Sequence, residues 1–180
     1  MKSINFLGIT ICQSKTFKCD WDAAKRKFYC NSNVILGRLG TSASAAVLLK
    51  LIHSQGVQNL LHGISATSLT KAELKSFSYA YNSFFAKIFK CVDNKIIMSC
   101  EFFSKYLCFE MLYEMYRYLF LSKLLNTGCL DKKNNLDKPD YQDYISLKAK
   151  YNFNEWDSIG KVKIKVWNHF ENLVQQDCVV

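Results

Sequence analysis

A capping box at residues 70–73 is the feature that most constrains the fold of this chain. In Thr70-Lys71-Ala72-Glu73 a threonine is followed three residues later by a glutamate, a pattern in which the two side chains bond each other's backbone amides at the start of a helix. Behind it, large apolar side chains recur every three or four residues: Leu74, Phe77, Tyr81, Phe84, Phe85 and Ile88. The spacing predicts a long helix with one aromatic face, and such a face needs other helices to cover it.

Apolar periodicity predicts those other helices on both sides of this one. The first is expected from Asp20, as N-cap, to about Leu36, with Gly37 and Gly40 ending it. The second runs from Ser42 or Ser44 to Gly56, and a short third covers 57–64. Two more are expected after the aromatic helix, from Asn94 to about Leu107 and from Glu110 to Asn126. Residues 3–18 alternate enough for a short strand pair turning at Gln13-Ser14-Lys15. The predicted fold class is mainly α: a short N-terminal β-hairpin, a helical bundle and a helical tail.

The predicted helices and strands divide the chain into four segments. Residues 1–18 form the strand pair, and residues 19–126 form the bundle. Residues 127–139 are polar and rich in lysine and asparagine, which is typical of a linker. Residues 140–180 are expected to form a tail of two helices.

The net charge of +9 is unevenly distributed along the chain. Residues 1–130 carry 16 Lys and Arg against seven Asp and Glu, whereas residues 131–180 carry eight of each. A basic domain attracts phosphate backbones because binding releases their counterions. The alternative is ordinary lysine-rich solubility, since 21 of the 24 basic residues are lysines.

Cysteine and histidine positions argue against a metal site. The eight cysteines include no Cys-x-x-Cys pair, and the three histidines (His53, His62 and His169) lie far apart in sequence. Unpatterned cysteines favour a reducing, intracellular location, in the nucleus or cytoplasm. No apolar run approaches the roughly 20 residues that span a membrane, so no membrane partner is expected.

Several short motifs occur in a fixed order over the first half of the chain. They are Phe6-Leu7-Gly8-Ile9, Thr16-Phe17-Lys18-Cys19, Ala24-Lys25-Arg26-Lys27-Phe28-Tyr29, Leu60-Leu61-His62-Gly63, Leu69-Thr70-Lys71, and Asn82-Ser83-Phe84-Phe85-Ala86-Lys87-Ile88-Phe89-Lys90. In order and rough spacing they resemble the stretch just after the palm in reverse transcriptases of LINE-type (non-LTR) retrotransposons. The chain departs from that family's pattern at His62, where a tyrosine is usual, at Ser65, where a glutamate is usual, and at Ser83, where an arginine is usual.

The resemblance implies the thumb region of an RNA-directed DNA polymerase, which would hold the template–primer duplex without making bonds. The polymerase chemistry of that family needs paired aspartates that bind metal ions, and no Asp-Asp pair occurs in this sequence. We therefore expect no catalytic residue and no cofactor in this chain, since Mg²⁺ would belong to an intact polymerase. The implied partners are a nucleic acid duplex, bound without sequence preference, and the missing palm domain.

Candidate binding residues follow from charge and from the resemblance. Expected phosphate contacts are Lys25, Arg26 and Lys27 on the first helix, then Arg38, Lys71, Lys75, Lys87 and Lys90. The strand Phe6-Leu7-Gly8-Ile9 would lie near the primer end. The competing interpretations are a solvated helix face for the cations and an edge strand with a glycine bulge for residues 6–9.

Two other functions remain open at this point. The chain could be a stand-alone helical domain that binds a partner helix, or a translated relic without function. The aromatic residues of the helical segments could stack on bases, but their helical periodicity favours core packing.

Overall fold

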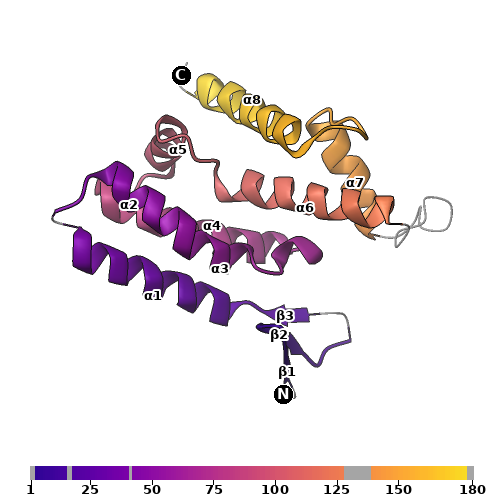
Figure 1. The fold of residues 1–180 in the computed structure, drawn as a ribbon, viewed down its shortest axis with the longest axis horizontal. Helices are drawn as coiled ribbons and strands as arrows, with labels where there is room; N and C mark the ends of the chain where they lie inside the picture. Colours follow the sequence, from indigo (N-terminus) through magenta and orange to yellow (C-terminus); the bar gives the residue numbers. More distant parts are fainter. Residues whose placement is uncertain (1–2, 16–17, 41, 128–138, 178–180) are drawn as a thin grey trace.

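The protein is a stack of helices with a small sheet at one end, as the sequence predicts (Figure 1). The computed structural model describes residues 3–15, 18–40, 42–127 and 139–177. The elements are β1 (Ser3–Phe6), β2 (Ile9–Cys12), β3 (Lys18–Asp20), α1 (Asp22–Leu39), α2 (Ala45–Ile52), the π-helix η1 (His53–Val57), α3 (Gln58–Leu61), the 3₁₀ helix η2 (Ile64–Ala66), α4 (Lys71–Phe89), α5 (Asn94–Phe103), α6 (Phe109–Asn126), α7 (Pro139–Lys150) and α8 (Ile159–Asp177).

Helix α4 and its capping box are confirmed. The amide of Glu73 donates to Thr70 Oγ1 at 3.2 Å, and the amide of Thr70 donates to Glu73 Oε2 at 2.9 Å. The apolar side chains at helical spacing pack as expected, and Phe77, Tyr81, Phe84 and Phe85 are buried against the rings of neighbouring elements. This aromatic face is the centre of the core.

The N-terminal sheet has the predicted hairpin and one turn more than predicted. Strands β1 and β2 pair antiparallel with Phe6 opposite Ile9, and the tight turn between them is Leu7-Gly8, both with positive φ. The expected strand through residues 6–9 is therefore wrong at its centre. The predicted turn at Gln13-Ser14-Lys15 lies between β2 and β3, which pair antiparallel as expected, so the sheet has three strands instead of two.

Helices α1, α2 and α3 agree with the prediction at Gly40, the C-cap of α1, and differ from it at Gly37 and Gly56. Gly37 lies inside α1, and Gly40 follows its last residue. Gly56 was expected to stop a helix, but the chain continues through η1 directly into α3. A Cβ at Gly56 would lie 3.3 Å from Phe28 Cδ2, so this glycine permits the close packing of η1 on α1.

The C-terminal helices share the same core. Residues Val162, Val166 and Phe170 of α8 are fully buried, and the Trp167 ring stacks on Phe102 of α5 with centroids 5.6 Å apart. Two apolar residues of these helices lie outside the core, since Phe103 of α5 and Ile159 of α8 are 78% and 60% exposed. The predicted linker lies almost wholly outside the described residues, so the division of the chain there stays a prediction.

Helix α5 differs from the prediction at both ends. Its N-cap is Asp93 and not Asn94, with the Asp93 side chain accepting a hydrogen bond from the amide of Lys95 at 2.8 Å, and it ends at Phe103, before the expected Leu107. Across the described ranges, no helix is long and apolar enough to cross a membrane. Within the same ranges, no three histidine, cysteine or acidic side chains come together as metal ligands would.

Candidate nucleic-acid interface

The three consecutive cations of α1 do not form one patch. Consecutive helical residues point about 100° apart, so Lys25, Arg26 and Lys27 cannot share a face. Arg26 and Lys27 are exposed, and Lys27 lines a small hollow beside the hairpin turn, together with Gly8 and His62. The three cations of the predicted cluster thus point in three different directions from the first turns of α1.

Lys25 is held in a bridge between two helices. Its Nζ lies 2.9 Å from Asp22 Oδ1 and donates to Ser76 Oγ of α4 at 3.0 Å, and the side chain is 22% exposed. The hydrogen bond and charge of Lys25 lower the pKa of Asp22. Because its ammonium already has these partners, Lys25 is better placed to join α1 to α4 than to bind phosphate.

The lysines of α4 and its C-cap all lie on the side of the helix away from its buried aromatic residues, with Lys71 and Lys87 at opposite edges of that side. Lys71 and Lys75 are four residues apart and Lys87 and Lys90 are three apart, with Tyr79 one turn beyond Lys75. All five side chains are exposed, and we call the four lysines, without Tyr79, the α4 basic face. From Lys71 to Lys90 it extends about 28 Å along the helix, close to one turn of a nucleic acid duplex.

Acidic charge on α4 is limited. The one acid in the helix is Glu73, whose carboxylate is engaged by the backbone and hydroxyl of Thr70. At the other end Lys87 Nζ donates to Asn33 Oδ1 of α1 at 2.7 Å, a neutral partner that leaves its charge uncompensated. Arg38 is exposed near the C-terminus of α1.

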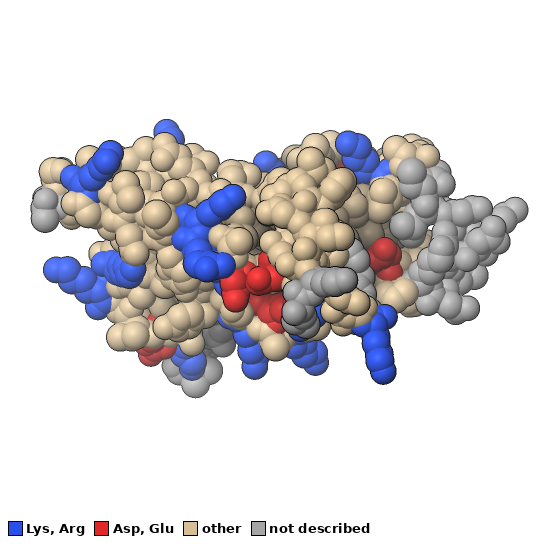
Figure 2. All heavy atoms as spheres, turned by 90° about the horizontal axis from the view of Figure 1, so that it is seen from below, with Lys and Arg blue, Asp and Glu red and all other residues tan. Residues whose placement is uncertain are grey.

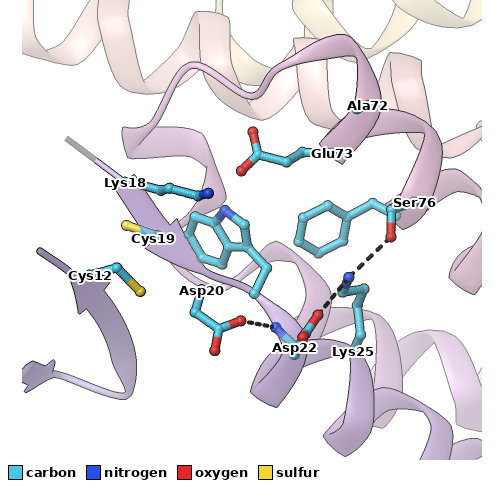
Figure 3. A pocket seen from close by; sticks show the side chains of 11 residues that line it. Cys12, Lys18, Cys19, Asp20, Asp22, Lys25, Ala72, Glu73 and Ser76 are labelled. Carbon is cyan, nitrogen blue, oxygen red and sulfur yellow. Dashed lines mark hydrogen bonds and ion pairs between the residues drawn. The ribbon is translucent and has the colours of Figure 1, made fainter. Parts of the chain in front are cut away.

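A groove of mixed charge separates β3 from the start of α4 (Figure 3). It has a volume of about 450 Å³ and is lined by Lys18 and Lys25 but also by Asp20, Asp22 and Glu73. Figure 2 shows the same mixture on a larger scale, with basic side chains dispersed over this face and acidic ones gathered near its middle. Phosphates would be repelled by these carboxylates, so the groove is a poorer nucleic-acid site than the α4 basic face.

The predicted primer-proximal residues 6–9 are held by the motif at 60–63. His62 Nε2 lies 2.9 Å from the carbonyl oxygen of Leu7, and a Cβ on Gly63, which has φ of +76°, would lie 2.2 Å from Ile9 Cδ1. Phe6 and Leu7 remain 62% and 76% exposed on the outer side of the sheet. His62 therefore has a structural role, which is to contact the hairpin turn, and its position needs no catalytic explanation.

Two buried charged residues were missed by the sequence reasoning. Arg117 of α6 is 1% exposed and donates to the carbonyl of Ser65, to Ser68 Oγ and to Asp140 and Asp143 of α7. Glu101 of α5 is also 1% exposed, and burial raises its pKa to about 8, with Glu110 adding to the effect. A charged residue at a buried helical position has no distinct sequence signal, so neither could have been singled out.

The chain was compared with protein-family models, with curated proteins and with solved structures, and no significant match was found in any of the three.

Proposed function

We propose that this chain binds the sugar–phosphate backbone of a nucleic acid duplex through the α4 basic face, as the post-palm part of a LINE-type reverse transcriptase. The observation that carries the proposal is the exposure of four lysines along the solvent side of α4, over about the length of a duplex turn. The net charge of +9 supports it, and so does the resemblance of the ordered motifs between Phe6 and Lys90. The interaction positions the duplex and reads no sequence.

Binding of this kind is weak and depends steeply on salt. Contacts to phosphate alone give dissociation constants of about 10⁻⁴ to 10⁻⁶ M at physiological salt. Each phosphate contact contributes about −0.9 to the slope of log K against log salt concentration for duplex DNA. The chain alone does not synthesise DNA under this proposal, because the paired aspartates and their Mg²⁺ belong to the palm.

The test is fluorescence anisotropy with a labelled RNA–DNA duplex over a series of salt concentrations. Replacing Lys71 and Lys75 by glutamine should reduce the salt slope by up to about 2 and weaken binding. The matched control replaces Lys123 and Lys161, which are exposed on α6 and α8 and carry the same charge. Equal effects of the two double variants would refute the assignment of the interface to α4.

Charge reversal of Lys25, Arg26 and Lys27 is a less selective test. A glutamate at position 25 would break the bridge to Ser76 and place like charge beside Asp22, so lost binding could come from a displaced α1. The α4 lysines avoid this problem, since neither Lys71 nor Lys75 makes a hydrogen bond or ion pair within the ranges that the structure describes.

A protein-binding function is the second candidate, and one observation favours it. The outer strand β1 has the exposed apolar side chains of Ile4 (72%) and Phe6 (62%), and Leu7 (76%) follows it in the turn. As the end strand of the sheet order β1-β2-β3, it also leaves one backbone edge unpaired. The missing palm would cover this strand under the first proposal. A stand-alone interaction domain would instead show nucleic-acid affinity that barely changes with salt.

A further inference from the structure

Helix α4 borders a second groove, on the side of α5. The groove has a volume of about 320 Å³ and lies between the C-terminal half of α4 and the start of α5. Its lining includes the ring of Tyr79, the apolar side chains of Ala86 and Ile97, and the two lysines Lys87 and Lys90. This volume is at the lower end of the range for small-ligand sites, about 300–1,000 Å³.

Tyr79 differs from the other aromatic residues of α4. Phe77, Tyr81, Phe84 and Phe85 are buried and each contacts another ring. Tyr79 is 76% exposed, and no ring contact to it occurs within the described residues. An exposed ring at the mouth of a groove gains little from packing within the protein, and one of its faces is available to a planar ligand.

The charge around this ring is positive. Lys75 is one helical turn before Tyr79, while Lys87 and Lys90 line the groove beyond it. No carboxylate is among the residues that line the groove in the described structure. The nearest acid in sequence is Asp93, whose side chain caps α5 by accepting from the amide of Lys95.

We propose that this groove takes an unpaired nucleobase, stacked on Tyr79, with the neighbouring phosphates on Lys87 and Lys90. The inference rests on the proposed function and makes it specific: the chain prefers a duplex that continues into a single strand over a blunt duplex. Stacking of one base on an aromatic side chain strengthens binding by about 5- to 150-fold, the equivalent of about 1–3 kcal/mol. The nucleic acid backbone would then follow the α4 basic face from the paired to the unpaired region.

The experiment compares two probes of the same sequence by fluorescence anisotropy, a blunt RNA–DNA duplex and one with a short single-stranded template overhang. The wild-type chain should bind the overhang probe at least about fivefold more tightly. Tyr79→Ala should remove this preference while leaving the blunt-duplex affinity unchanged, and Tyr79→Phe should keep it. The matched control is Trp156→Ala, which removes a side chain that is 92% exposed and outside the groove.

The outcomes separate this inference from the function on which it rests. Equal affinity of the wild-type chain for both probes, or a preference that survives Tyr79→Ala, overturns the base site even when the α4 lysine variants weaken both complexes. Loss of the preference in Trp156→Ala as well overturns it too, because the effect would then not be local to the groove. Binding of neither probe overturns the proposed function itself.

Discussion

Replacement of Glu101 by glutamine should remove a large dependence of stability on pH. The Glu101 side chain is buried between α4 and α6, and burial raises its pKa from 4.5 to about 8. When the Asn82 amide is oriented with its nitrogen toward α5, it donates to Glu101 Oε1 at 3.2 Å and to the carbonyl of Ser78 at 3.1 Å. The Tyr81 hydroxyl donates to the Leu107 carbonyl, so it does not stabilise the carboxylate.

The sign of the effect follows from the raised pKa. Between about pH 4.5 and 8 the folded chain keeps a proton that the unfolded chain has released. The stabilisation from the neutral carboxyl is therefore complete below about pH 4.5, decreases as the pH rises, and is lost above about pH 8. At about 1.4 kcal/mol per pH unit, the total is on the order of 5 kcal/mol, a large part of the stability of a domain of this size.

Urea unfolding at several values between about pH 5 and pH 9 measures this loss. Over this window the wild-type chain should lose about 4 kcal/mol more than Glu101→Gln, because the amide cannot ionise. Glu110→Gln is the control: it removes the neighbouring charge from an exposed position and should change the dependence only slightly. Parallel curves for wild type and Glu101→Gln would show that the carboxyl is not buried as described.

Three further predictions can be checked by the same unfolding measurement. Gly63→Ala should lower the free energy of unfolding by about 2–4 kcal/mol, because residue 63 has positive φ and its Cβ would overlap Ile9 Cδ1. Adding Ile9→Val should restore part of this stability. No recovery would rule out the close approach to Ile9 as the cause of the loss. Thr70→Ala should cost about 1 kcal/mol and Thr70→Ser much less, since serine keeps the capping oxygen; equal losses would contradict the capping bond. Arg117→Leu should cost about 3 kcal/mol and Asp140→Asn less, because Asp143 still accepts from the arginine; the reverse order would show that Arg117 does not hold α7.

The helices could be predicted because their signals are local. The capping box at residues 70–73 and the aromatic spacing behind it lie within one helix, and they fixed both the start of α4 and its buried face. Val162, Val166 and Phe170 of α8 recur at the same spacing and are buried too. A period of three to four residues decides such elements without knowledge of the rest of the chain.

The errors came from residues whose role depends on distant partners. Gly56 looks like a helix stop in sequence, and its real role depends on Phe28 from another helix. The Leu7-Gly8 turn carried a usable signal, a glycine between two short apolar strands, but the resemblance favoured one continuous strand. The phosphate contacts expected at Lys25, Arg26 and Lys27 stay a prediction, and since adjacent helical residues point in different directions, the three could not meet phosphate from one side.

The motifs behind the family resemblance have structural roles that are complete without nucleic acid. His62 and Gly63 hold the hairpin turn, Thr70 caps α4, and Asn82 can donate to buried Glu101. A chain could keep these residues for stability alone, so their order does not by itself argue for binding.

Four exposed side chains of α4 and its C-cap, unlike these motif residues, have no structural role within the described part of the fold. Lys71, Lys75, Lys90 and Tyr79 make no described contact on which the fold depends, and long charged or aromatic side chains at a surface contribute little to stability. Substitutions there should leave the free energy of unfolding nearly unchanged. A functional effect at these positions would therefore measure binding directly, and this is why the proposed interface can be tested on α4 and not on the motifs that first suggested it.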